Sequence, residues 1–140
     1  MLEVACAIIV NNGKILVTQH SGDSDHPFQW EFPGGKLKTG ETFEDCIIRE
    51  INEELEIEIR ILTRMHSVKW DYGIKKIELV PFLCSIKSGE IRLTEHLHFL
   101  WKDPESLYEL DFSAADYELI NLHSNQLILE EYFREYMNNS

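Results

Sequence analysis

Residues 35–57, GKLKTGETFEDCIIREINEELEI, join a glycine-led loop to the clearest helix pattern in the chain. Apolar side chains recur at helical spacing at positions 43, 47, 48, 51 and 55, which predicts a helix with one buried face. Thr42 can cap its first turn, because a threonine hydroxyl accepts a hydrogen bond from an exposed backbone amide. The stretch therefore predicts a loop that runs directly into an amphipathic helix over Thr42–Leu55.

Three glutamates, Glu50, Glu53 and Glu54, share one side of this predicted helix. At about 100° per residue they fall within an arc of roughly 100°. Carboxylates held this close repel one another, and hard oxygen ligands of this kind suit Mg²⁺ or Mn²⁺. The alternative is a solvated acidic face on which Arg49 pairs with Glu53, four residues on. The helix alone does not separate these two interpretations.

The preceding segment, Trp30-Glu31-Phe32-Pro33-Gly34-Gly35-Lys36, favours ligand binding. A glycine pair lets the backbone approach a ligand closely, although by itself it is equally an ordinary tight turn. The whole pattern resembles the Nudix box, which is Gly, five residues, Glu, seven residues, Arg-Glu, an aliphatic, any residue, Glu-Glu, any residue, Gly and an aliphatic. Only Glu56 differs, standing where the family has the glycine that helps to end the helix.

The WEFPGGK loop is similar to the MutT branch of this family, and weaker similarity extends from Val4 to Leu122. The resemblance implies a single Nudix hydrolase domain over residues 1–140, with an α/β/α sandwich around a mixed central sheet. Family members hydrolyse nucleoside diphosphates linked to another group. MutT-like members cut nucleoside triphosphates to a monophosphate and pyrophosphate, with Mg²⁺ as the expected cofactor and Mn²⁺ as an alternative.

The resemblance also implies roles for individual residues. Arg49 would orient a glutamate through a salt bridge, and Glu41 would support the loop or the metal shell. Glu95 is a candidate ligand or general base, or a plain solvated acid in a loop. The implied metal ligands are the Gly35 carbonyl, Glu50, Glu53 and Glu54, with Glu50 alternatively the general base.

Substrate recognition is predicted at Asp116, within a segment that resembles the one before the late helix of MutT-like proteins. An ionised aspartate only accepts hydrogen bonds, so it favours a base that presents N–H donors. Cytidine nucleotides and oxidised guanine nucleotides both satisfy this condition. The alternative is an aspartate that merely stabilises the first turn of a helix through its dipole.

Aromatic and basic residues complete the candidate binding site. Phe32 and Tyr72 could stack on the base or belong to the core. The candidates to meet the triphosphate are His20, Lys36, Lys75 and Lys76, although lysines are usually surface residues. Two further histidines, at positions 96 and 98, suggest either a transition-metal pair or ordinary hydrogen-bonded histidines.

The rest of the chain alternates strand and helix patterns, which indicates an α/β sandwich with a mixed sheet. The predicted strands are Val4–Val10, Lys14–His20, Trp30–Phe32, Ile57–Trp70, Ile74–Ile86 and His96–Trp101. Two serine-opened helices are predicted over Ser113–His123 and Ser124–Met137.

Composition limits the partners. The net charge of −12 over 140 residues disfavours long nucleic acids and anionic membranes. Three cysteines without CxxC spacing predict neither a disulfide framework nor a structural zinc site. With no secretory signal or membrane-spanning segment in the pattern, we expect a cytoplasmic protein, monomeric or homodimeric. Two other functions stay open: hydrolysis of an ADP-ribose-type dinucleotide, and nucleotide-dependent regulation without catalysis.

Overall fold

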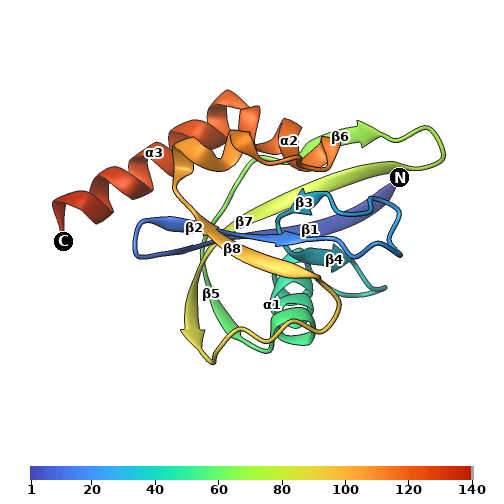
Figure 1. Ribbon diagram of the computed structural model, residues 1–140, viewed down its shortest axis with the longest axis horizontal. Coiled ribbons are helices and arrows are strands. Elements are labelled where there is room, and N and C mark those ends of the chain that lie inside the picture. Colours follow the sequence, from blue (N-terminus) through green and yellow to red (C-terminus); the bar gives the residue numbers. More distant parts are fainter. Residues whose placement is uncertain (140) are drawn as a thin grey trace.

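The computed structural model describes residues 1–139 and shows a mixed sheet between two layers of helices (Figure 1). Helix α1 (Phe43–Leu55) covers one face, and α2 (Ala114–Asn121) and α3 (His123–Asn138) cover the other. The described strands are β1 (Leu2–Asn11), β2 (Lys14–Gln19), β3 (Trp30–Glu31), β4 (Gly34–Lys36), β5 (Glu58–Arg64), β6 (Val68–Asp71), β7 (Lys76–Ser88) and β8 (His98–Lys102). The predicted α/β/α sandwich is therefore confirmed.

Strand β1 lies at the centre of the sheet. It pairs in parallel with β7, from Leu2 opposite Ile77 to Ile9 opposite Cys84, and antiparallel with β2 and β4. Its alternate side chains enter two different cores: Ala7 and Ile9 pack toward α1, whereas Ile8 packs toward α2 and α3. A strand buried on both faces needs no polar alternation, which explains its continuous apolar sequence.

The predicted strand Ile57–Trp70 is instead two strands, β5 and β6, which both pair antiparallel with β7. Asn125 of α3 explains the break. Its side-chain oxygen accepts a hydrogen bond from the His66 amide at 2.7 Å, and its side-chain nitrogen donates to the His66 carbonyl at 2.9 Å. Because a buried asparagine satisfies these backbone groups, residue 66 leaves the sheet ladder.

Helix α1 begins and ends close to its predicted bounds. The Thr42 hydroxyl accepts a hydrogen bond from the Asp45 amide at 3.1 Å, as the sequence predicts. Glu56 closes the helix in the left-handed region, with φ 56° and ψ 33°, and its amide donates to the Asn52 carbonyl. The glutamate thus adopts the conformation that the family's glycine usually supplies.

Other local predictions need correction. Ser113 does precede α2, but α3 begins at His123 rather than at a serine cap, because the amides of Asn125 and Gln126 already bond to the Leu122 carbonyl. A short 3₁₀ helix, η1 (Pro104–Glu109), has no counterpart in the prediction. His96 precedes β8 instead of belonging to it. Of the helices in residues 1–139, none is long and apolar enough to cross a membrane.

Candidate active site

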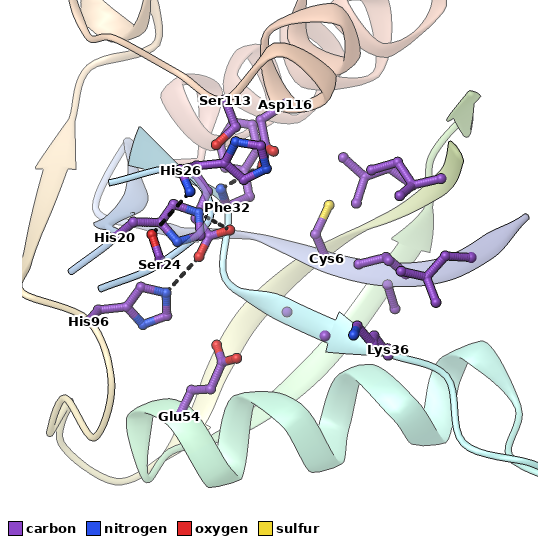
Figure 2. A pocket seen from close by; sticks show the side chains of 18 of the residues that line it. Cys6, His20, Ser24, His26, Phe32, Lys36, Glu54, His96, Ser113 and Asp116 are labelled. Atoms are coloured by element: carbon purple, nitrogen blue, oxygen red, sulfur yellow. Dashed lines mark hydrogen bonds and ion pairs between the residues drawn. The ribbon is translucent and has the colours of Figure 1, made fainter. Parts of the chain in front are cut away.

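A cavity of about 300 Å³ opens between β1, β4, the end of α1, the β2–β3 loop and the start of α2 (Figure 2). Glycines bring its walls together. A Cβ at Gly34 would lie 2.0 Å from the Ala5 carbonyl oxygen, and one at Gly35 would lie 2.2 Å from Cδ of Glu50. Only residues without a side chain permit this approach, so the glycine pair sets the distance between the loop, the sheet and the acidic helix. The predicted residues that line the cavity are His20, Phe32, Gly35, Lys36, Glu54, Tyr72, Lys75, Glu95, His96 and Asp116.

Beside this cavity, Arg49 joins three of the acidic side chains. Its Nε lies 2.7 Å from Glu41, and its Nη1 lies 2.9 Å from Glu50 and 3.2 Å from Glu53. The hydrogen bonds from Arg49 lower the pKa of Glu41 to about 2. The structure therefore brings the four box residues Glu41, Arg49, Glu50 and Glu53 together, with Arg49 bonded to all three glutamates rather than to one.

Glu54 points the other way, into the cavity, and is only 9% exposed. Its Oε2 atom has no hydrogen-bond partner among the described residues. Burial raises the pKa of Glu54 to about 9, and the nearby carboxylates of Glu31, Glu50 and Glu95 act in the same direction. An uncompensated acid in this position needs either a proton or a cation.

The residues present fit a divalent cation. The Gly35 carbonyl and the carboxylates of Glu50, Glu53 and Glu54 are all hard oxygen donors, which suits Mg²⁺ or Mn²⁺. The Oε2 atom of Glu54 has no hydrogen-bond partner among the described residues, so it is available to coordinate a cation. Within residues 1–139 no three acidic, histidine or cysteine side chains already converge as a ready-made ligand set. Glu50 and Glu53 are both bonded to Arg49.

Glu31 lies in the middle of the cavity wall between two histidines, and the sequence analysis did not single it out. Its two carboxylate oxygens lie 2.9 Å from Nε2 of His20 and 2.7 Å from Nε2 of His96. Burial by itself would raise the pKa of Glu31, but the hydrogen bonds from both histidines outweigh it and lower the pKa. His96 is therefore a hydrogen-bonded histidine, whereas His98 is exposed to solvent.

Asp116 closes the far end of the cavity and is 7% exposed. Its Oδ1 accepts a hydrogen bond from the Phe32 amide at 2.9 Å. Burial raises the pKa of Asp116 well above its ordinary value, and Glu31 acts in the same direction. The sequence led us to expect an ionised side chain that only accepts hydrogen bonds, and burial opposes that form of Asp116.

The aromatic and basic candidates occupy different positions around this end. Phe32 is buried with its ring 5.3 Å from that of Phe112, which makes it part of the core as well as of the wall. The Tyr72 hydroxyl accepts a hydrogen bond from the Ala115 amide at 2.9 Å. Lys75 pairs with Asp25 at 3.5 Å, so it links two loops at the mouth of the cavity.

Comparisons with known proteins agree with this geometry. Residues 1–125 match the model of the NUDIX domain family. A CTP pyrophosphohydrolase of Escherichia coli is 32% identical over 120 residues, which cover 86% of this chain and 89% of the relative. An 8-oxo-dGTP diphosphatase of the same species is 30% identical over 120 residues, covering 85% and 93%.

A solved structure supports the same assignment. The solution structure of the MutT protein of methicillin-resistant Staphylococcus aureus, described as a Nudix hydrolase, superposes with a TM-score of 0.72. The two chains are 32% identical, and the match covers 93% of this chain and 96% of that one. With its box residues gathered around a cavity, this chain belongs to the Nudix hydrolase family.

Proposed function

We propose that this enzyme hydrolyses a nucleoside triphosphate to the monophosphate and pyrophosphate, with Mg²⁺ as its metal and Mn²⁺ as a substitute. Two features of the cavity support the proposal. Its lower end gathers oxygen donors at Gly35 and Glu54, and its upper end holds the buried polar side chain of Asp116. A nucleotide has the matching shape, with phosphates at one end and a base at the other.

At the metal end, the Gly35 carbonyl, Glu50, Glu53 and Glu54 would hold the ion. Bound Mg²⁺ offsets phosphate charge and polarises the attacked phosphorus. Glu54 must first lose its proton, which its raised pKa makes costly until positive charge arrives. Arg49 positions Glu41, Glu50 and Glu53 through its ion pairs.

Proton transfer from the attacking water needs a carboxylate near the ion. Glu50 and Glu95 are the two candidates: Glu50 is bonded to Arg49 next to Gly35, and Glu95 lines the cavity directly. Lys36 and Lys75 line the same cavity and can meet the phosphate oxygens. Glu53→Gln tests the ligand role, and comparison of Glu50→Gln with Glu95→Gln identifies the base.

At the other end, Asp116 is the proposed base-binding residue. A neutral carboxyl group offers one O–H donor and one acceptor, which matches N3 and the N4 amino group of cytosine. An ionised carboxylate instead matches the N1–H and N2 amino groups of guanine. The raised pKa of Asp116 favours a cytidine nucleotide, and the 32% identical relative named CTP pyrophosphohydrolase supports this choice. Oxidised guanine nucleotides are the second candidate, supported by the 8-oxo-dGTP diphosphatases among the relatives.

The observation that carries the proposal is the buried, unpartnered Glu54 oxygen beside Gly35 in the cavity. The test measures pyrophosphate release from CTP, dCTP, GTP, 8-oxo-dGTP and ATP, and phosphate-bond cleavage in ADP-ribose, with and without Mg²⁺. Mg²⁺-dependent pyrophosphate release from a cytidine or oxidised guanine nucleotide supports it. If only ADP-ribose is cleaved, the substrate is a nucleoside diphosphate derivative and not a nucleoside triphosphate. Nucleotide binding without turnover would indicate a regulator.

We also propose that the chain forms one domain over residues 1–140. Both cores share β1, and the family match reaches residue 125. Helix α3 contributes Leu129 to one of these cores, so the C-terminal segment through that position packs with the rest. A single cooperative unfolding transition, seen alike by tryptophan fluorescence and circular dichroism, is the expected result.

A further inference from the structure

Ser113, at the start of α2, carries a hydroxyl group that the fold leaves unused. The residue is only 2% exposed, and its Oγ has no hydrogen-bond partner among residues 1–139. It lines the cavity together with Asp116, and Figure 2 shows the two side chains next to each other at the first turn of α2. A buried hydroxyl without a partner is energetically unfavourable, so its presence in the cavity wall points to a partner from outside the chain.

The usual role of a serine in this position does not apply. A serine before a helix normally accepts a hydrogen bond from the amide two or three residues on. Here the Ala115 amide donates to the Tyr72 hydroxyl at 2.9 Å, and the Asp116 amide bonds to its own carboxyl group. Within the described chain Ser113 makes no side-chain cap. Both amides are already satisfied, which frees the hydroxyl.

Its backbone groups, in contrast, are fully used. The Ser113 amide donates to the Trp30 carbonyl at 2.9 Å, and its own carbonyl accepts from the Tyr117 amide at 2.9 Å. These two bonds fix the residue between β3 and α2. The hydroxyl is therefore held in place by the main chain, three residues before Asp116, where side chains on one helical face are neighbours.

We propose that Ser113 is a specificity-determining residue, whose hydroxyl donates a hydrogen bond to an exocyclic carbonyl of the base that Asp116 binds. This inference rests on the proposed function, since it needs a base at Asp116. Cytosine presents its O2 carbonyl next to N3, and guanine presents O6 next to N1–H. Adenine has no carbonyl on the corresponding edge. Ser113 thus selects cytosine and guanine bases against adenine.

The discrimination arises because a buried polar group is left unpaired by the wrong base. With cytosine or guanine bound, the hydroxyl gains its missing partner. With adenine bound, the hydroxyl stays orphaned and the adenine C–H lies against it. One hydrogen bond of this kind changes affinity by about tenfold.

The test compares wild-type protein with Ser113→Ala, and uses Ser106→Ala as the matched control. The Ser106 hydroxyl donates to the Asp103 carbonyl at 3.0 Å, away from the cavity. Calorimetric titration measures binding of CMP, GMP and AMP, and steady-state kinetics measures KM and kcat for the best triphosphate. We expect Ser113→Ala to weaken CMP or GMP binding and raise KM about tenfold, with AMP binding and kcat unchanged.

Stability separates this role from a structural one. Removal of an orphaned hydroxyl leaves the Tm of Ser113→Ala unchanged or higher, whereas loss of a hidden structural bond would lower it and contradict the inference. Equal weakening of CMP, GMP and AMP binding, or no change in base preference, also overturns it. If the wild type binds CMP or GMP selectively but hydrolyses no triphosphate, the proposed function fails while the effect of Ser113→Ala on selectivity still decides the role of Ser113. If the wild type has no base preference, the role of Ser113 is refuted, while pyrophosphate release from the triphosphates still decides the proposed function.

Discussion

At one end of the cavity, Glu41, Glu50 and Glu53 share a single arginine, while at the other end Asp116 and Ser113 lie in a buried wall. The first group is charged, and Glu53 leaves 54% of its side chain exposed. Asp116 and Ser113 are almost inaccessible to solvent, and burial favours the neutral form of the Asp116 carboxyl group. On the proposed function, the metal end would bind its ligand by charge, whereas the base end would bind through the direction of its hydrogen bonds.

The two ends differ in how a bound ligand would lower their free energy. Charged groups that are already paired at the surface contribute little to stability, so Arg49 mainly sets geometry. Buried polar groups without partners carry an energetic cost that a matching ligand removes. Glu54 shares features of both ends, because it belongs to the acidic helix but is buried like Asp116.

The largest expected effect is at the metal end. Glu53→Gln keeps the size of the side chain but removes a charged oxygen donor, and we expect kcat to fall by on the order of 10³ while the fold persists. Pyrophosphate release at saturating Mg²⁺ measures the loss, and circular dichroism monitors the fold. Glu44→Gln, an exposed glutamate in the first turn of the same helix, is the control and should keep full activity. A fully active, metal-dependent Glu53→Gln enzyme would refute the ligand role.

The next effect tests whether Arg49 acts through geometry. Arg49→Lys keeps the positive charge but loses the planar fork that bonds Glu41, Glu50 and Glu53 together. We expect kcat/KM to fall about 100-fold, with a higher Mg²⁺ requirement and little change in Tm. The Mg²⁺ dependence of the rate is the measurement. If Arg49→Lys matches the wild type, charge alone suffices and the contrast between the two ends weakens.

A third prediction uses the pH dependence of stability without metal. Glu54 has a pKa of about 9 in the folded chain against 4.5 as its ordinary value. Between these pH values the folded chain retains a proton that the unfolded chain has released, so stability falls as the pH rises. Urea unfolding in EDTA, followed from about pH 5 to about pH 9, should show a falling free energy of unfolding.

Two controls sharpen this measurement. Glu54→Gln mimics the protonated acid, so its free energy of unfolding should depend less steeply on pH. Added Mg²⁺ should stabilise the wild type most at the alkaline end, where the carboxylate is available to it. An unchanged slope in Glu54→Gln would show that Glu54 is not the group responsible.

The smallest effect lies outside the cavity, at Glu56. Its φ of 56° is a strained conformation for a residue with a side chain, so Glu56→Gly should raise the free energy of unfolding by about 0.5–1 kcal/mol. Activity should stay unchanged because the carboxylate of Glu56 is not one of the proposed metal ligands. Urea unfolding gives the first quantity and the pyrophosphate assay the second. A loss of stability would mean that the glutamate side chain contributes more than the strain costs.

Sequence patterns predicted that the acidic side chains of the proposed metal end lie together, because these residues are close to one another in the chain. Arg49, Glu50 and Glu53 occupy fixed positions on one helix, and helical geometry brings them to one side of it. Glu31 was missed because its partners, His20 and His96, come from segments 11 and 65 residues away. Ser113 was predicted only as the start of a helix, since no sequence pattern shows that Tyr72 occupies the amide it would otherwise cap.

The sequence by itself determined the acidic helix, its capping threonine and the family, because these depend on local spacing along one element. Only the tertiary structure decided which carboxylates are buried, since Glu54 and Asp116 lie where α1, α2 and the sheet meet, and burial raises the pKa of each. The physical reason is that periodicity is a local property of the chain, whereas desolvation and hydrogen-bond pairing depend on every segment packed around a group.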